Sequence, residues 1–513
     1  MAACLPCATA SALVLTRRLP LLPSFTRRST ICGRRIVCVK NFQINATRKV
    51  FVPLNYAQRR IQSCGAASSS QSVQCRSQED VLVLGIETSC DDTGAAVVTT
   101  DGRILGEAIA SQAELLGQWG GVVPKLASEE HRKFIDKVVA DALHNAGVQE
   151  SALSAVAVTI GPGLSPCLHV GVRKARIIAK THRLPIIGVH HMEAHALVAR
   201  LTEKQVGFPF LVLLVSGGHN LLLLSQNVGQ YVQLGTTVDD AIGEAYDKTA
   251  RLLGLDMRKG GGPALEELAR EGDPKAIKFS VPMRGPKYLD CNFSYAGLKN
   301  QVRMAIESRN IDGDQVSLSM ASAEDRKIRA DIAASFQRVA VQHLEDKCRR
   351  AIEWARRLAP SLSSLVVSGG VASNQTVRAK LGALASELDL QLVCPPPRLC
   401  TDNGVMVAWA GVEHFRLGMY EAPPDADEPD DVRLDLRPRW QLGDIYEEGQ
   451  SEARSLKRMN QHPSLTAQVC LYARIFTEKF GASRLQVDFW NQGPKSALMT
   501  PPVMKTPEKR FAF

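Results

Sequence analysis

The chain of 513 residues lacks any run of 18 or more apolar residues, the length that a membrane-spanning helix requires. No membrane span is therefore expected. Its 13 cysteines lack the paired spacing of a disulfide framework or a zinc knuckle, and six of them lie within the first 75 residues. The cysteines therefore do not indicate a small secreted fold or a cysteine-based metal site.

Acidic residues are absent from positions 1–78, whereas arginine, serine and small residues are frequent there. This composition is typical of an organellar transit peptide. A secretory signal is the alternative, but the chain starts without a charged segment, and Arg-Arg pairs recur beyond residue 30. The sequence predicts that residues 1–80 form a disordered transit peptide for the mitochondrion, with plastid or dual targeting as alternatives.

Excess positive charge is absent from the rest of the chain, although the whole chain carries a formal charge of +10. Residues 1–80 hold 12 of the 62 basic and two of the 52 acidic residues, which leaves 50 of each. Net charge therefore does not indicate nucleic-acid binding. Any contact with RNA must use a local patch.

Two successive series of elements follow the leader. Each series begins with three strands, continues through helices and further strands, and opens with a strand that runs into a polar or glycine-rich turn, at Ser89–Gly94 and Ser216–His219. Such units build mixed sheets with helices on both faces. Ligands of α/β sheets bind at the strand ends. We therefore expect an α/β fold with two duplicated lobes around a central nucleotide cleft.

The domain boundaries follow from this duplication. We assign residues 81–205 to the first lobe, which residues of about 402–442 complete, and residues 206–401 to the second lobe. Residues 443–513 show little periodicity and form a C-terminal extension of unknown role. That composition predicts a tail without regular structure.

His191 and His195 lie four residues apart in a segment without glycine or proline. On a helix this spacing puts both rings on one face, where they can bind one metal ion. On its own, such a pair is more often two polar residues that face solvent or a partner. A third ligand elsewhere in the chain decides between these interpretations. Asp402 is one candidate, although an aspartate just before a helix is more often its N-cap.

Glycine-rich turns follow two apolar strands, at Ser216-Gly217-Gly218 and Ser368-Gly369-Gly370. Their backbone N–H groups can converge on a phosphate. After the second turn a helix begins, and Ser373 or Asn374 is expected to cap it, so the helix N-terminus favours an anion there. The two turns indicate a nucleotide cleft.

Together these motifs resemble the organellar tRNA N6-adenosine threonylcarbamoyltransferases over residues 81–442. The resemblance rests on ten motifs in chain order: Gly85-Ile-Glu-Thr-Ser-Cys-Asp-Asp-Thr93, Gly120-Gly-Val-Val-Pro124, Gly161-Pro-Gly-Leu164, His190-His-Met-Glu-Ala-His195, Leu214-Val-Ser-Gly-Gly-His219, Gly243-Glu-Ala-Tyr-Asp-Lys-Thr249, Phe293-Ser-Tyr-Ala-Gly-Leu-Lys299, Ser368-Gly-Gly-Val-Ala-Ser-Asn374, Cys400-Thr-Asp-Asn-Gly404 and Arg437-Pro-Arg-Trp440. Three positions depart from the family pattern, at Asp92, Lys125 and Asn220. The family's actin-like (ribonuclease H-like) architecture agrees with the duplication.

The resemblance implies an activity and a set of site residues. It implies transfer of a threonylcarbamoyl group from threonylcarbamoyl-AMP, made by an upstream synthase, to N6 of adenosine 37 of tRNA. It implies one divalent metal ion, Fe or Zn, on His191, His195 and Asp402, and a homodimer. Asp91 is the candidate for orienting or deprotonating the amine. The implied substrate contacts are Leu214, Val215, Ser216, Gly217, Gly218, Asp247, Gly262 and Asn374.

Two other classes of enzyme compete with this interpretation. A zincin-type metalloendopeptidase needs glutamate directly after the first histidine, where this chain has Met192, and its acid stands one position later at Glu193. An ATP-dependent small-molecule kinase shares the architecture but has no use for the histidine pair. A non-catalytic nucleotide-binding scaffold is a third option.

Overall fold

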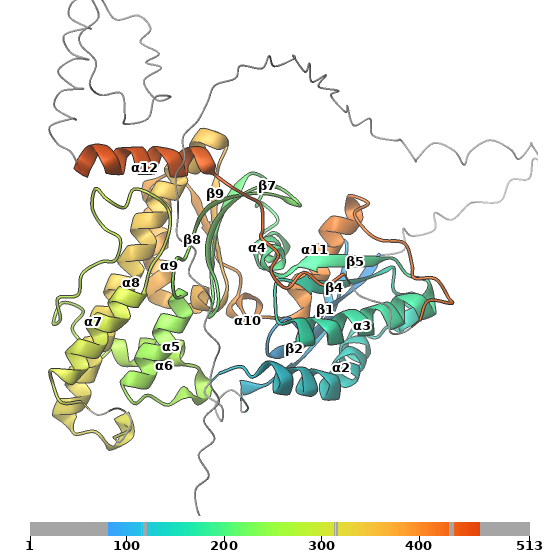
Figure 1. Cartoon of the computed structure of the whole chain (residues 1–513). Coiled ribbons are helices and arrows are strands. Elements are labelled where there is room, and N and C mark those ends of the chain that lie inside the picture. The colour runs from blue at the N-terminus through green and yellow to red at the C-terminus, as the bar shows by residue number, and fades with distance from the viewer. Residues whose placement is uncertain are drawn as a thin grey trace, which may run out of the picture. The chain divides into compact units, whose positions relative to one another are not determined.

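Two sheets with the same strand order form the framework of the structure, which is a computed structural model (Figure 1). The structure describes residues 81–461 apart from 114, 116–120, 312, 314–315 and 430–434. The expected transit peptide and the extension beyond residue 461 lie outside the described residues. All described residues fall within one compact unit of the chain.

The first sheet has the order β3-β2-β1-β4-β5. β1 pairs antiparallel with β2 and parallel with β4, so the three-strand meander continues into a parallel half. β1 and β4 are short apolar runs buried on both faces, as strands covered by helices on both sides must be. The strands are β1 (Leu82–Glu87), β2 (Asp92–Thr99), β3 (Ile104–Ser111), β4 (Ala155–Gly161) and β5 (Ile186–His190).

The second sheet has the order β10-β9-β6-β7-β8-β11. Read from β8 to β10, it repeats the order of the first sheet, and β11 is one further strand at its edge. The repetition confirms the expected duplication of an α/β unit. Its strands are β6 (Phe210–Val215), β7 (Asn220–Asn227), β8 (Gln230–Thr236), β9 (Ser364–Ser368), β10 (Gln391–Val393) and β11 (Asp444–Ile445).

Local sequence signals set the starts of the two longest helices. Pro124 fits the first turn of one, and Ser322 caps the other. The helices are α2 (Pro124–Ala146), α3 (Ser165–His182), α4 (His191–Thr202), α5 (Ile242–Leu252), α6 (Gly261–Ala269), α7 (Ala296–Glu307), α8 (Ala323–Leu358), α9 (Gln375–Glu387), α10 (Pro397–Cys400), α11 (Gly404–Arg416) and α12 (Glu447–Gln461).

Three apolar cores separate the layers of helices and sheets. α4 and α11 lie between the two sheets, and their core takes side chains from both, such as Val83 and Val212 (Figure 1). α2 and α3 cover the outer face of the first sheet. The helices α5 to α9 cover the outer face of the second. The shared middle layer therefore joins the lobes and carries the histidine pair.

Glycines let α11 approach the first sheet more closely than any other residue would. A Cβ on Gly85 would lie 2.2 Å from the backbone N of Ala408, and a Cβ on Gly404 would lie 2.5 Å from the Cα of Ala95. Both distances are far shorter than the contact distance between two non-bonded atoms. The segment just before α11, which contains Asp402, is therefore fixed against the strands.

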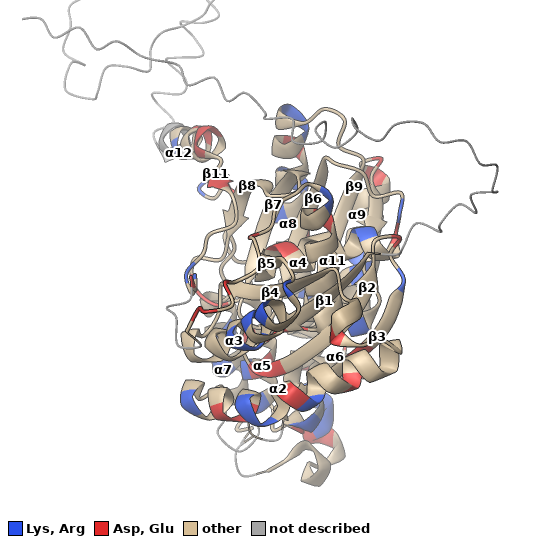
Figure 2. Cartoon of the chain, turned by 90° about the vertical axis from the view of Figure 1, so that its right-hand side faces the viewer, with Lys and Arg blue, Asp and Glu red and all other residues tan. Residues whose placement is uncertain are grey.

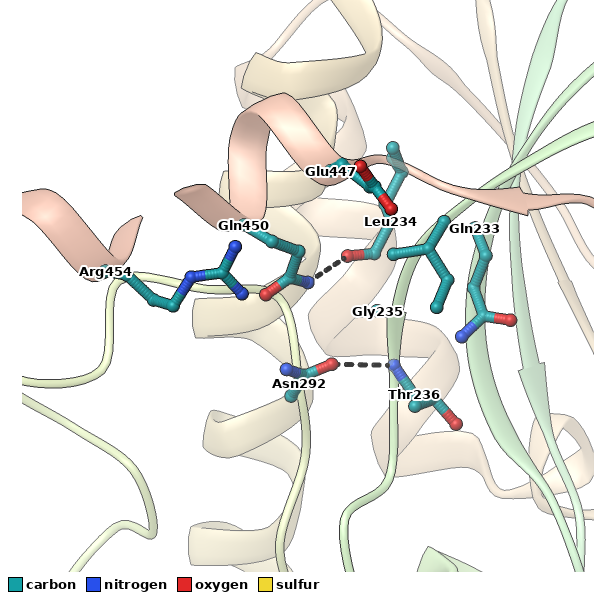
Figure 3. A pocket seen from close by; sticks show the side chains of 9 residues that line it. Gln233, Leu234, Gly235, Thr236, Asn292, Glu447, Gln450 and Arg454 are labelled. Carbon is teal, nitrogen blue, oxygen red and sulfur yellow. Dashed lines mark hydrogen bonds between the residues drawn. The ribbon is translucent and has the colours of Figure 1, made fainter. Parts of the chain in front are cut away.

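The C-terminal extension is partly folded, which corrects the prediction of a tail without regular structure for residues 443–461. β11 pairs with β8, Tyr446 packs edge-on against Trp354 of α8, and Gln450 of α12 donates to the Leu234 carbonyl oxygen at 3.2 Å. The periodicity of this segment is weak because a single short strand and one helix face make its contacts. α12, β8 and Asn292 enclose a cavity of 440 Å³ (Figure 3).

Charges of both signs are interspersed on the face that carries α2 and α3 (Figure 2). Along α2, for example, Glu129, Arg132, Lys133 and Asp136 follow one another closely. This mixture agrees with the formal neutrality of residues 81–513. Among the described helices, none is both long and apolar enough to cross a membrane.

We expect Gly404→Ala to destabilise the protein by about 1–3 kcal/mol, because the added methyl group overpacks the contact between α11 and β2. Gly382→Ala on α9 is the matched control, since its Cβ would lie at an ordinary 3.6 Å from the nearest side chain. Thermal unfolding measures both. Equal melting temperatures for Gly404→Ala and the unmodified protein would contradict this account of the packing.

Candidate metal centre and nucleotide cleft

His190, which directly precedes His191, fixes the start of α4. Its Nδ1 accepts from the backbone N–H of Met192 at 3.1 Å, which makes His190 the N-cap of the helix. Its Nε2 lies 3.1 Å from the carbonyl oxygen of Trp440 and donates to it. Both ring nitrogens of His190 are therefore used in holding the helix, whereas Nε2 of His191 faces Asp402.

The structure brings His191, His195 and Asp402 together. One ligand atom from each lies within 4.8 Å of the others. Nε2 of His195 lies 3.0 Å from Oδ1 of Asp402, and Nε2 of His191 lies 3.5 Å from the same oxygen. The three side chains come from α4 and from the loop between α10 and α11. They converge on one point, although 207 residues separate His195 from Asp402.

A buried carboxylate orients the first of these histidines. Oε2 of Glu87, the last residue of β1, lies 3.1 Å from Nδ1 of His191. Glu87 also accepts from the backbone N–H of Ser89 at 2.6 Å and from the Thr159 hydroxyl at 2.5 Å. A carboxylate behind an imidazole fixes its tautomer and is the usual arrangement behind a metal-binding histidine.

The carboxylates around His191 favour a positive charge at the point where the three side chains meet. Burial lowers the pKa of His191, but the Glu87 and Asp402 carboxylates outweigh burial and raise it to about 9. Burial also opposes ionisation of Asp402, yet the nearby histidines hold its pKa below the ordinary value. Two imidazole nitrogens and one carboxylate oxygen in this field fit a divalent cation. No other group of three or more possible metal ligands of this kind occurs in the described part of the chain.

Asp402 is not the N-cap of α11, so the default role suggested by its spacing is wrong. Asn403 caps the helix instead, since its Oδ1 accepts from the backbone N–H of Met406 at 2.8 Å. This leaves the Asp402 carboxylate available to the two histidines.

The Ser216-Gly217-Gly218 turn follows Leu214 and Val215 at the end of β6. The Ser216 hydroxyl accepts from the backbone N–H of His219 at 3.0 Å, which closes the turn. A Cβ on Gly217 or Gly218 would meet no other atom within 4 Å, so these glycines face open space. The turn is thus shaped to admit a ligand against its backbone.

The remaining residues of the predicted nucleotide site come from neighbouring elements of the second lobe. Asp247 of α5 accepts from the backbone N–H groups of Gly261 and Gly262 at the start of α6. Asn374 caps α9 and donates to Oε1 of Gln337 at 3.0 Å. α9 and α6 meet where the backbone N–H of Gln375 donates to Glu266 at 2.9 Å.

The acidic turn at Asp91-Asp92 of the first lobe lies close enough to Asp402 for their charges to interact. Burial raises the pKa of Asp91, and the charge of Asp402 adds to this rise. Burial and the charge of Asp91 raise the pKa of Asp92 to about 7. His131 of α2 holds the turn, because its Nε2 donates to the Cys90 carbonyl oxygen at 3.1 Å.

Sequence reasoning missed the roles of Glu87 and His219. Burial and the charges of His191 and His195 lower the pKa of His219 to about 4, which places its ring in the field of the histidine pair. Both residues belong to motifs that the sequence shows. Their positions could have indicated these roles, because Glu87 ends the first strand of one lobe and His219 follows the first strand of the other by four residues.

Glu193 cannot serve as the general base of a peptidase. Its Oε1 accepts from the Gly229 backbone N–H at 2.8 Å and its Oε2 lies 3.0 Å from Nε2 of His414, on the side of α4 away from the ligands. A residue two positions after His191 is rotated about 200° around the helix axis. The metalloendopeptidase alternative is therefore not favoured.

These features define a class of protein, a duplicated α/β fold in which two histidines and one carboxylate converge near a glycine-rich turn. A profile of the family "TsaD: tRNA N6-adenosine threonylcarbamoyltransferase" matches residues 103–409. The chain is 65% identical over 389 residues to a probable mitochondrial tRNA N6-adenosine threonylcarbamoyltransferase of Arabidopsis thaliana, covering 76% of this chain and 80% of that protein. The chain belongs to the tRNA N6-adenosine threonylcarbamoyltransferase family.

More distant relatives carry the same name. The chain is 45% identical to the mitochondrial protein of Xenopus tropicalis, covering 66% of this chain and 84% of that protein. It is 42% identical to a protein of Paramagnetospirillum magneticum, covering 72% of this chain and 99% of that protein. This chain therefore has segments beyond the length of the bacterial protein.

We expect the stability of the metal-free protein to depend on Asp92. Its folded pKa of about 7 lies above the unfolded value, so the stability that it contributes is present below pH 4 and is lost as the pH rises to 7. Asp92→Asn removes this loss. Its melting temperature in chelator should exceed that of the unmodified protein, by more at pH 8 than at pH 5.

Asp101→Asn is the control for this measurement. Hydrogen bonds from Thr99 and Arg103 lower the pKa of this exposed carboxyl, so its removal acts in the opposite direction. Parallel curves of melting temperature against pH for Asp92→Asn and the unmodified protein would contradict the prediction.

Proposed function

We propose that this protein is a mitochondrial enzyme that transfers the threonylcarbamoyl group from threonylcarbamoyl-AMP to N6 of adenosine 37. Its tRNA substrates read codons that start with A, and the products are t6A37 and AMP. The observation that carries the proposal is the convergence of His191, His195 and Asp402 beside the glycine turns, in a chain of this family. The names of the relatives support the mitochondrial assignment.

His191, His195 and Asp402 would hold one divalent metal ion, Fe or Zn, which are the metals that imidazole and carboxylate ligands suit. When bound, the ion supplies Lewis-acid polarisation of a substrate oxygen. Glu87 keeps Nε2 of His191 directed at this place through its hydrogen bond to Nδ1.

The second lobe would hold the AMP part of the substrate. The turn at Leu214–Gly218, together with Asp247, Gly262 and Asn374, would contact it, and a Cβ on Gly217, Gly218 or Gly262 would meet no other atom within 4 Å. Backbone N–H groups bind phosphate oxygens well in such turns. Because AMP in a mixed anhydride is already a good leaving group, holding the two reactants together supplies much of the rate.

The transfer forms a bond between N6 of the adenine and the carbamoyl carbon, and it breaks the bond from that carbon to the phosphate oxygen. AMP leaves with the electron pair. Asp91 accepts the proton that N6 loses, and burial suits it to this role by raising its pKa. The tRNA and a synthase that makes the adenylate are the partners, and the homodimer stays a prediction.

The purified protein should modify unmodified tRNA in the presence of threonylcarbamoyl-AMP, and chelation of its metal should abolish the product. His191→Ala should do the same because it removes a ligand. His182→Ala is the control, since His182 pairs with Glu150 on the surface, away from the ligands. Mass spectrometry of digested tRNA measures the product. Undiminished product from His191→Ala, or none from the unmodified protein, would refute the proposal.

Asp91→Asn should slow transfer by about 10²–10⁴-fold, the usual contribution of a positioned general base. Single-turnover measurement with bound substrates separates this effect from binding. Zn²⁺ affinity should stay unchanged, because Asp91 is not among the three ligands. A rate within twofold of the unmodified protein would remove Asp91 from the mechanism.

A further inference from the structure

Glu193 makes contacts that the transfer reaction does not require. It lies between the two histidine ligands in sequence, is 3% exposed, and belongs to no predicted set of catalytic or substrate-binding residues. Burying a carboxylate away from water is costly unless hydrogen bonds and charges compensate for the lost hydration. The structure provides both.

The two oxygens of Glu193 bind two different parts of the protein. Oε1 accepts from the backbone N–H of Gly229 in the β7–β8 turn at 2.8 Å, and Oε2 lies 3.0 Å from Nε2 of His414 in the last turn of α11. These contacts outweigh burial and lower the pKa of Glu193. The side chain therefore joins the histidine-bearing helix to the second lobe and to α11.

The position of α11 matters because Asp402 lies two residues before its first residue, Gly404. α4 supplies the two histidines, and the segment before α11 supplies the carboxylate. The distance between these two helices therefore determines whether the three groups can reach one ion. A contact at residue 193 acts between the two ligands, so a shift of the helix there moves both imidazoles.

We propose that Glu193 is a positioning residue, which sets the separation between the histidine pair and Asp402 by holding α4 against α11 and the β7–β8 turn. This inference rests on the metal centre of the proposed function. It assigns Glu193 no contact with the metal or the substrate.

A second ion pair joins the same two helices and provides a matched control. Nε of Arg200 lies 2.9 Å from Oε1 of Glu413, which neighbours His414 in α11. Arg200 lies five residues beyond His195, near the end of α4. Glu413→Gln therefore weakens the contact between the helices near the end of α4 and leaves the two contacts of Glu193 in place.

The test measures Zn²⁺ affinity by competition with a fluorescent chelator, alongside the melting temperature of the metal-free protein. Glu193→Gln keeps the shape of the side chain but removes its charge. We expect its affinity for Zn²⁺ to fall by about 10–100-fold, the usual range for residues that orient metal ligands. Glu413→Gln should lower the melting temperature similarly while its affinity stays within twofold. Unchanged affinity in Glu193→Gln, or an equal loss in both variants, would overturn the proposal.

Two substitutions of His414 keep the proposal testable if Glu193→Gln does not fold. His414→Gln retains a donor for Glu193 and should bind Zn²⁺ nearly as the unmodified protein does. His414→Leu removes the donor and should bind it more weakly. Equal losses in the two variants would show that the hydrogen bond to Glu193 is irrelevant.

Failure of this inference is distinguishable from failure of the proposed function. Unmodified protein that binds neither Zn²⁺ nor Fe²⁺ would overturn the metal centre, and with it the role of Glu193. Normal metal binding with no modification of tRNA would overturn the proposed reaction and leave the role of Glu193 standing.

Discussion

The close packing of α4 and α11 in the layer between the two sheets is the constraint on which the site depends. Glycines at positions 85 and 404 allow α11 to lie against the first sheet at distances that no side chain would permit. The same layer buries apolar side chains of both sheets in one core. Because both sheets share this core, a movement of either lobe would disturb α4, which carries the two histidines, and α11, which follows Asp402.

Buried carboxylates on two sides of α4 have separate tasks. Glu87 lies behind His191 and directs its ring, whereas Glu193 on the opposite side faces His414 and the β7–β8 turn. Each is costly to bury alone and is stabilised by several donors. The histidine helix is thus held by polar contacts from both sheets, while the apolar core supplies the bulk of the packing.

The sequence allowed most of the fold to be predicted because its strands are short apolar runs bounded by polar or glycine-rich turns. It failed where such patterns are weak. The folded part of the C-terminal extension, β11 and α12, was predicted to be a tail without regular structure.

The site was partly predictable for a different reason. The spacing of His191 and His195 shows that they share a face, but no spacing rule connects them with Asp402 more than 200 residues later. The family resemblance supplied that link, and the role of Asn403 as the N-cap removes the competing role of Asp402. Glu87 was missed because its contact depends on the register of β1 beside α4, which only the folded chain defines.

The duplication explains how one fold accommodates two kinds of chemistry. The first strand of each lobe ends in a turn at the same topological place, yet β1 ends in Glu87 and leads to Asp91, whereas β6 ends in Val215 and leads to Gly217 and Gly218. Carboxylates repel phosphate and attract cations, while exposed backbone N–H groups do the reverse. The two lobes thus present carboxylates and backbone N–H groups, respectively, at equivalent strand ends.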